Sequence, residues 1–127
     1  MGLPGAGKTT LAKKLSKLIG AVHFNADEIR QNINKDLGYS ESDRLEQAKR
    51  MKWLADKVVE AGHDVVVDFI CPTDETRDAF GECFLIFMDT ISAGRYEDTN
   101  QLFKPPIKYN ARVTDWEGAD KVLDLFK

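Results

Sequence analysis

The sequence has little of what marks several large classes of protein. None of its apolar runs approaches the length of about 20 residues that spans a bilayer, and its Gly-rich start lacks the basic, apolar character of an export signal. It contains only two cysteines, Cys71 and Cys83, and we expect both to be reduced thiols in the cytoplasm. Internal repeats, low-complexity tracts and linkers are also absent, so a single domain over 1–127 is expected.

Excess charge of one sign is absent as well. The chain has 18 basic and 21 acidic residues, which gives a formal net charge of −3. Such a protein has no overall attraction to polyanions, and a nucleic-acid scaffold is therefore disfavoured. Basic residues do concentrate in the first half, among them Lys8, Arg30 and Arg44. This local excess suits a protein that handles a phosphorylated small molecule, although the lysines of 13–17 are better explained as a solvated helix face.

Apolar patterns predict helices and strands in alternation. Short apolar or β-branched runs predict buried strands at 21–24, 65–67, 84–88 and 111–114. Helices are predicted at 10–19, 27–33 and 42–60, within 72–82, and at 117–126. The polar segment 92–110 contains two prolines and is interpreted as a lid or loop. Strands that alternate with helices favour an α/β fold of three layers, with a parallel sheet flanked by helices.

The clearest motif lies at the start of the chain. Residues 2–9 read Gly-Leu-Pro-Gly-Ala-Gly-Lys-Thr and match the phosphate-loop pattern G-x-x-x-x-G-K-[ST] without a gap. In such a loop, backbone amides bind phosphate oxygens, and the helix that follows adds its N-terminal partial charge. We expect Lys8 to reach the β- and γ-phosphates of ATP and the Thr9 hydroxyl to ligate Mg²⁺. The predicted nucleotide-binding residues are Gly5, Ala6, Gly7, Lys8, Thr9 and Thr10.

One feature departs from a P-loop NTPase of the nucleoside-kinase-like type. A phosphate loop normally follows the central buried strand of the sheet, but only Met1 precedes this loop. We therefore expect the first strand to be missing or truncated. We expect that the assigned start is too late, at a methionine that ends this strand, because loss of a central strand would expose two strand edges.

Two acidic residues at strand ends are candidates for catalysis and metal binding. Asp27 follows the strand at 21–24, at the carboxyl edge where ligands gather in open α/β sheets. A carboxylate there can accept the proton of an attacking hydroxyl, whereas an N-cap for the next helix is the structural alternative. Asp68 ends the strand at 65–67 and is a candidate to hold Mg²⁺ through water, with a capping or turn role as the alternative.

Three further segments carry a resemblance to the adenylylsulfate kinase family. Residues 26–30, 34–40 and 43–44 read Ala-Asp-Glu-Ile-Arg, Asn-Lys-Asp-Leu-Gly-Tyr-Ser and Asp-Arg. They are similar to that family's Asp-Gly-Asp-Asn-Val-Arg, Asn-Lys-Asp-Leu-Gly-Phe-Ser and Asp-Arg runs. Segments 68–72 and 77–79 likewise resemble its Ser-Phe-Ile-Ser-Pro and Arg-Asp-Ala. The resemblance extends over residues 2–90, and its most distinctive part is 34–40.

The resemblance implies a kinase that uses ATP and Mg²⁺ to phosphorylate the 3′-hydroxyl of adenosine 5′-phosphosulfate in sulfate assimilation. It implies that Asp27 lies near this hydroxyl, that Arg30 and Arg44 bind the phosphosulfate, and that Tyr39 stacks on the adenine from the family's Phe position. The predicted substrate-binding residues are Asp27, Arg30, Tyr39, Arg44, Gln47, Ile70 and Cys71. The predicted catalytic residues are Lys8, Asp27 and Arg95, and the predicted metal ligands are Thr9 and Asp68.

Several positions depart from the family's pattern. Asn25 replaces its first acid, Gln47 replaces a substrate-contacting Asn, and Cys71 replaces a serine that is phosphorylated in some members. The lid is also shorter and lacks the family's basic segment. Arg95 is the arginine there that can clamp the transferring phosphoryl group, and a surface ion pair with a neighbouring carboxylate is the alternative.

Two other functions stay open at this point. Residues 25–31 also resemble a segment of polynucleotide 5′-kinases, so a polynucleotide or other small-metabolite kinase is the first alternative, although the net acidity disfavours nucleic acid. The second is a non-catalytic nucleotide-binding module that kept the loop and lost turnover. We expect a phosphorylated, nucleotide-like small molecule as the ligand and no contact with a membrane, and a homodimer stays open as the assembly.

Overall fold

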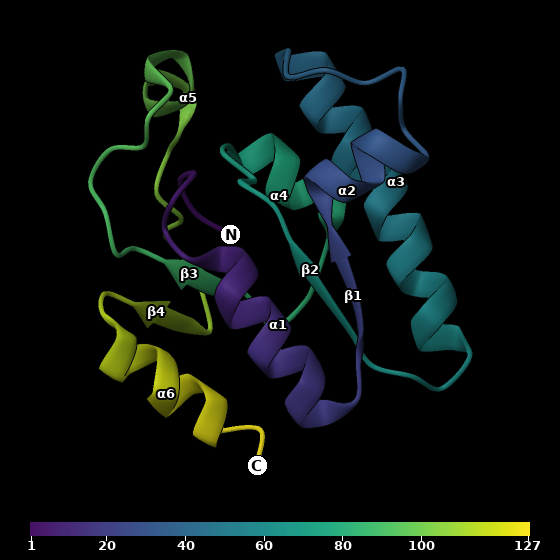
Figure 1. Cartoon of the computed structure of the whole chain (residues 1–127). Helices are drawn as coiled ribbons and strands as arrows, with labels where there is room; N and C mark the ends of the chain where they lie inside the picture. Colours follow the sequence, from purple (N-terminus) through teal and green to yellow (C-terminus); the bar gives the residue numbers. More distant parts are fainter.

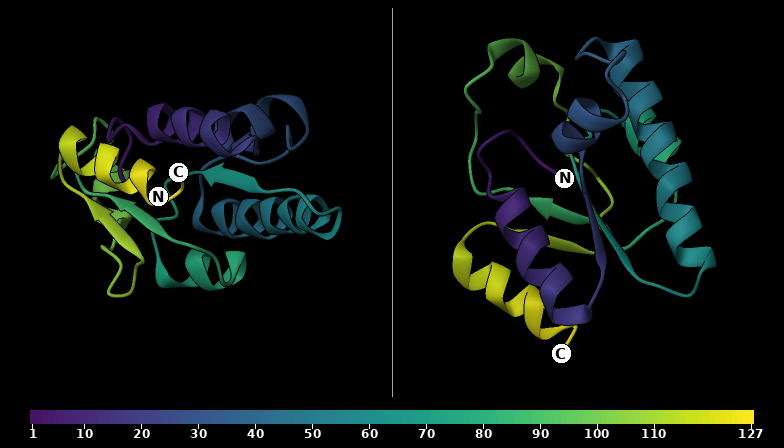
Figure 2. Two further views of the ribbon diagram at one scale, coloured as in Figure 1. Left: turned by 90° about the horizontal axis from the view of Figure 1, so that it is seen from below. Right: turned by 45° about the vertical axis from the view of Figure 1, so that its right-hand side comes forward.

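The computed structural model describes residues 1–127, with helices on both sides of parallel strands (Figures 1 and 2). Along the chain the elements are α1 (Lys8–Ile19), β1 (Val22–Asn25), α2 (Ala26–Asn32), α3 (Glu41–Glu60), β2 (Val65–Asp68), α4 (Asp74–Phe80), β3 (Ile86–Met88), α5 (Glu97–Leu102), β4 (Ala111–Val113) and α6 (Trp116–Asp124). The predicted α/β class is therefore confirmed. None of the helices combines the length and the apolar character that a membrane crossing demands.

Side-chain caps explain where several helices begin. Asn25 caps α2, because its side chain accepts a hydrogen bond from the amide of Glu28 at 3.0 Å. Ser40 caps α3 in the same way, and Thr73 and Thr76 form a reciprocal capping box at the start of α4. Each cap satisfies an amide that the first helical turn would leave unpaired. The chain can therefore turn from β1 directly into α2 at the carboxyl end of the strand.

The strands form two separate parallel pairs. β1 pairs with β2 so that Asn25 lies opposite Asp68, and β3 pairs with β4 so that Met88 lies opposite Val113. No strand joins the two pairs, and none precedes the phosphate loop within residues 1–127. This is the place where the sequence predicts a missing or truncated strand.

Met1 and Gly2 connect the two pairs at one end. The amino group of Met1 donates to the carbonyl of Ile86 at 2.9 Å, and the amide of Met88 donates to the carbonyl of Met1 at 2.9 Å. The amide of Gly2 donates to the carbonyl of Ile70 at 3.2 Å. Beyond this bridge, a largely apolar hollow of about 1230 Å³ lies between β2 and β3.

The helices cover the strands unequally. Helix α1 packs against β1, β2 and α6, whereas α3 packs against β2 and α4 (Figure 1). The main core lies where α1 and α6 meet the β3–β4 pair, and its buried residues are Ala6, Leu11, Met88, Val113, Ala119 and Val122. Because Ala6 belongs to the phosphate loop, this core packs directly against the loop.

The segment 92–110 differs from its predicted form. It is not entirely a loop, since it contains the short helix α5, which is anchored through the buried side chain of Thr99. The side chain of Asn100 also accepts a hydrogen bond from the Gly94 amide at 2.7 Å and closes the turn before the helix. Helix α5 lies at the end of the molecule toward which β1 points (Figure 1).

Candidate active site

The phosphate loop needs glycine at two of its positions. Gly5 and Gly7 adopt φ angles of 88° and 94°, which side chains other than glycine rarely adopt. A Cβ atom at Gly7 would also lie 2.7 Å from a ring carbon of Trp116 on α6. The loop then enters α1 at Lys8, so its amides and the N-terminus of this 12-residue helix face the same space. This is the arrangement that binds phosphate groups.

Lys8 folds back over the loop that precedes it. Its Nζ donates to the carbonyl of Leu3 at 2.9 Å. Burial lowers the pKa of Lys8 to about 8, and the nearby carboxylates of Asp68 and Asp27 oppose this shift. A lysine that is poorly solvated in this way gains a strong partner when an anionic phosphate arrives.

Thr9 and Asp68 meet beside the phosphate loop. The Thr9 hydroxyl donates to Oδ1 of Asp68 at 3.0 Å, and the Asn25 amide donates to the same oxygen at 3.0 Å. Asp68 contacts side chains rather than the amides of a following turn, so its capping alternative has no support in these contacts. A hydroxyl and a carboxylate are hard oxygen donors, which fit Mg²⁺ when nucleotide phosphates supply further ligands.

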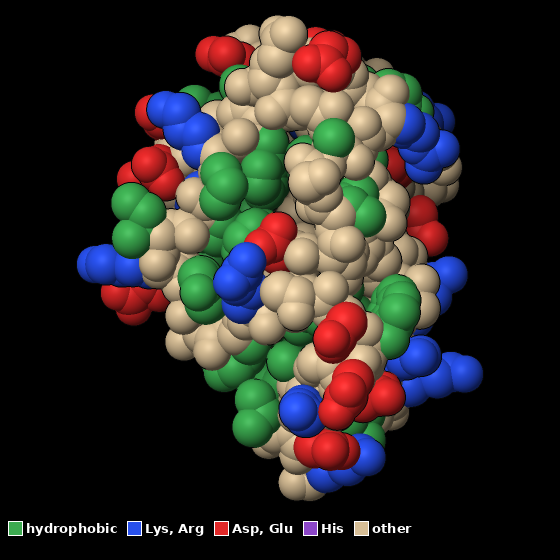
Figure 3. Space-filling model, turned by 90° about the vertical axis from the view of Figure 1, so that its left-hand side faces the viewer, with side chains coloured by type: hydrophobic (Ala, Val, Ile, Leu, Met, Phe, Trp, Pro, Cys, Tyr) green, Lys and Arg blue, Asp and Glu red, His purple; other side chains and the backbone are tan.

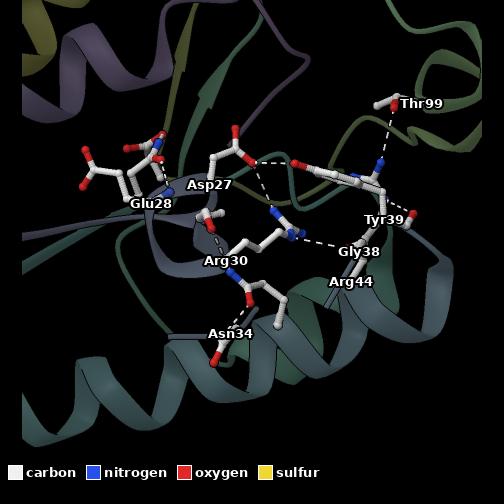
Figure 4. Close-up of polar contacts among 12 residues, drawn as sticks. Asp27, Glu28, Arg30, Asn34, Gly38, Tyr39, Arg44 and Thr99 are labelled. Carbon is white, nitrogen blue, oxygen red and sulfur yellow. Dashed lines mark hydrogen bonds and ion pairs between the residues drawn. The ribbon is translucent and has the colours of Figure 1, made fainter. Parts of the chain in front are cut away.

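Asp27 lies on the first turn of α2, and its carboxylate does not cap this helix. Asn25, not Asp27, is the N-cap of this helix. Oδ1 of Asp27 accepts hydrogen bonds from Tyr39 Oη at 3.1 Å and from Arg30 Nη1 at 3.3 Å (Figure 4). With an exposed fraction of 66%, the Asp27 side chain is open to an acceptor molecule.

Tyr39 and two arginines form a compact group across from Asp27. The guanidinium carbons of Arg30 and Arg44 lie 4.5 and 5.5 Å from the centroid of the Tyr39 ring. Arg44 Nε donates to the Tyr39 carbonyl at 2.9 Å, and Arg44 Nη2 donates to Thr99 Oγ1 on α5 at 3.3 Å (Figure 4). Burial lowers the pKa of Arg44, with Arg30 adding to the effect. These contacts connect α2, α3 and the lid helix.

One cavity of about 460 Å³ joins the phosphate loop to this group. It brings together Gly5, Lys8, Thr9, Asp27, Arg30, Tyr39, Arg44, Asp68, Ile70, Cys71 and Arg95 of the predicted residues. Arg95 is exposed, lies over the Tyr96 ring at 5.6 Å and forms no ion pair. The predicted residues Ala6, Gly7, Thr10 and Gln47 do not line the cavity.

Gln47 instead lies between two helices. Its side chain is fully buried, donates to the Ala26 carbonyl at 3.1 Å and accepts from Asn34 Nδ2 at 2.8 Å. These contacts fix α2 against α3. Cys71 lies at the other wall, with a φ of 50° and a thiol whose pKa burial raises to about 11, so it stays neutral.

The sequence analysis did not single out His23. Its Nε2 lies 2.5 Å from Oδ2 of Asp68. Side chains at alternate positions of a strand share one face, and His23 is two residues before Asn25 on β1. This alternation is the signal that could have placed His23 in the same cluster.

Comparison with known proteins agrees with this geometry. A family model described as adenylylsulphate kinase matches residues 1–105. The bifunctional enzyme NodQ of Rhizobium meliloti (strain 1021) is 38% identical over 100 residues, which are 70% of this chain and 16% of NodQ. The adenylyl-sulfate kinase of Shewanella sp. (strain ANA-3) is 41% identical over 83 residues, 61% of this chain and 40% of that protein. The chain thus spans well under two thirds of these curated relatives.

A solved structure extends the likeness over nearly the whole chain. The APS kinase CysC of Mycobacterium tuberculosis, in complex with AMPPNP and APS, superimposes with a TM-score of 0.81 at 25% identity, covering 98% of this chain and 93% of that one. Since the family model alone matches well over half of the residues, the chain belongs to the adenylylsulphate kinase family.

Proposed function

We propose that the chain is an ATP-dependent kinase that phosphorylates the 3′-hydroxyl of adenosine 5′-phosphosulfate, as a cytoplasmic step of sulfate assimilation. The observation that carries this proposal is the single cavity that joins the phosphate loop to Asp27, Arg30, Tyr39 and Arg44. Donor and acceptor can therefore meet without leaving the site. The CysC structure named above, described with both AMPPNP and APS, supports the same pair of ligands.

The donor end binds the phosphates of ATP. Lys8 exchanges its contact with the Leu3 carbonyl for the β- and γ-phosphates and stabilises the charge that develops during in-line transfer. Thr9 and Asp68 are the residues that would hold Mg²⁺. When bound, this ion neutralises charge on the phosphate oxygens. Arg95 on the lid segment approaches the transferring group.

The acceptor end binds and orients the nucleotide that receives the phosphate. Arg30 and Arg44 present multiple donors to the phosphosulfate, and the Tyr39 ring stacks on adenine. Asp27 accepts the proton of the attacking hydroxyl through its exposed carboxylate. Arg30 holds one oxygen of Asp27 and leaves the other free for this task.

A polynucleotide acceptor has less support. Lysines and arginines on the face drawn in Figure 3 are interspersed with acidic side chains rather than gathered into a stripe, and the net charge is −3. A protein that follows a nucleic-acid backbone needs a continuous basic surface. A small phosphorylated acceptor is therefore preferred.

The test is ADP formation from MgATP with and without adenosine 5′-phosphosulfate. We expect stimulation by the acceptor, which Lys8→Ala abolishes. Binding of ATP without stimulation would reject this acceptor and send the search to other small hydroxyl compounds. Binding of ATP without transfer to any acceptor tried, in the wild type as in Lys8→Ala, would identify a nucleotide-binding module instead.

A further inference from the structure

A partly buried histidine lies against the carboxylate that ends β2. The side chains of His23 and Asp68 are only 18% and 6% exposed. They project from neighbouring strands on one face, because His23 is in register with Val66, two residues before Asp68. Diagonal neighbours on paired strands lie within reach of long side chains. His23 itself does not line the nucleotide cavity.

Both oxygens of Asp68 are occupied. Oδ1 accepts hydrogen bonds from Thr9 and Asn25, each at 3.0 Å, whereas Oδ2 is 2.5 Å from Nε2 of His23. Because an ionised carboxylate can only accept hydrogen bonds, Nε2 is the donor of this contact. The carboxylate is thus held in one rotation, with Oδ1 toward the phosphate loop.

The pairing has a chemical reason. Asp68 stands where the resembling family segment has serine, so this chain carries an extra negative charge beside Thr9. A buried carboxylate without partners is strongly destabilising. Thr9 and Asn25 satisfy one of its oxygens, and His23 satisfies the other. His23 therefore supplies a hydrogen bond that a buried carboxylate at this position needs.

We propose that His23 is a positioning residue that donates to Oδ2 of Asp68 and so keeps Oδ1 turned toward Thr9, where Mg²⁺ would be held. This inference rests on the proposed function only in that the phosphate loop binds a magnesium–nucleotide complex. It does not depend on which molecule accepts the phosphate. Groups that orient a metal ligand from behind typically change metal affinity about 10- to 100-fold when they are removed.

A purely structural hydrogen bond between β1 and β2 is the competing explanation. It predicts that loss of His23 weakens nucleotide binding equally with and without the metal. A positioning role predicts a loss that is confined to the magnesium complex. The two explanations are therefore separated by comparing the same nucleotide in the two states.

The experiment measures the Kd of AMPPNP by calorimetry, with Mg²⁺ and with a chelator. For His23→Leu we expect the Kd of the magnesium complex to rise about 10- to 100-fold, while the metal-free Kd changes less than about twofold. The other histidine, His63, is exposed, so His63→Leu is the matched control and leaves both values unchanged. In an Asp68→Ser background, His23→Leu adds less than about twofold, because its partner is gone.

Equal weakening in the two states, or an undiminished effect of His23→Leu in the Asp68→Ser background, overturns the proposal. If His23→Leu alone does not fold, His23→Gln keeps an N–H donor, and we expect its binding loss to be smaller but still confined to the magnesium complex. A wild-type protein whose binding ignores Mg²⁺ also overturns it. Because AMPPNP binding requires no turnover, failure to phosphorylate adenosine 5′-phosphosulfate would reject the proposed function without altering this result.

Discussion

The two ends of the site differ in how firmly their carboxylates are held. At the nucleotide end, the Asp68 side chain is 6% exposed and is held by groups from α1 and β1. At the acceptor end, the Asp27 side chain is 66% exposed and contacts only Arg30 and Tyr39. A buried, fully bonded group keeps its position before any ligand arrives, whereas an exposed one adjusts to its partner.

This difference matches the different ligands proposed for the two ends. The proposed donor, ATP with Mg²⁺, would be common to kinases of this kind, so a rigid, preorganised end suits it. The acceptor is what distinguishes one kinase from another, and its end includes the exposed side chains of Asp27 on α2 and Tyr39 in the 34–40 turn. Changes at the acceptor end should therefore alter turnover or acceptor affinity and leave nucleotide binding intact.

The largest expected effect comes from Asp27→Asn. The variant keeps the shape of the side chain but removes the proton acceptor, and general-base catalysis contributes about 10²- to 10⁴-fold. We expect kcat to fall by at least about 100-fold, with the Kd of MgATP unchanged. The neighbouring Glu28→Gln on α2 is the control, and a variant Asp27→Asn with normal kcat would exclude Asp27 as the base.

Arg44→Ala should raise the KM for the acceptor about 10- to 100-fold, since a hydrogen bond to a charged group contributes about 1.5–3 kcal/mol. Arg44 is buried and contacts Thr99 on α5, so the lid should also open. Arg50→Ala on the same helix is the control, because Arg50 pairs with Asp36 outside the cavity. Steady-state kinetics with varied acceptor concentration measures the KM of the two variants. Equal KM values for Arg44→Ala and Arg50→Ala would contradict the assignment.

A pH titration tests the nucleotide end. Because burial lowers the pKa of Lys8 to about 8, its ammonium is present below that pH and is lost as the pH rises. We expect the Kd of AMPPNP to increase about fivefold between pH 8 and 9 as the protonated fraction falls. Lys8→Arg stays charged throughout, so its Kd should stay flat over this interval. A pH dependence in Lys8→Arg as steep as that of the wild type would assign the titration to another group.

The smallest effect is expected for Tyr39→Phe. This variant keeps the ring beside Arg30 and Arg44 and removes only the hydroxyl that contacts Asp27. Because both partners are exposed, that contact contributes little, and kcat and KM should each change less than about threefold. A drop in kcat comparable to that of Asp27→Asn would instead mean that the phenol takes part in proton transfer.

Much of the fold could be predicted from short-range patterns. The phosphate loop, the parallel strands and most helix ends depend on local residue types, such as the glycine at Gly7 and the cap at Ser40. The helix α5 was not predicted, because its stability depends on the burial of Thr99 against the rest of the site rather than on its own short sequence.

Site residues that belong to a sequence motif could be predicted. Site residues that are brought together by strand pairing or helix packing could not. The grouping of Lys8, Thr9 and Asp27 in one cavity follows from the loop and from the strand end, and their roles stay predictions. His23 needed the β1–β2 register, which no single strand reveals. Gln47 could not be placed from sequence, because whether a residue of α3 faces the cavity or α2 depends on how the two helices pack.

The contact between Gly7 and Trp116 has a consequence for how the protein can be trimmed. The family match ends at residue 105, yet the ring that a Cβ at Gly7 would strike belongs to α6, beyond that boundary. Helix α6 also supplies Ala119 and Val122 to the core under the loop. The folded unit therefore extends past the end of the family match. A fragment cut at residue 105 would lack the α6 side chains that pack against the phosphate loop.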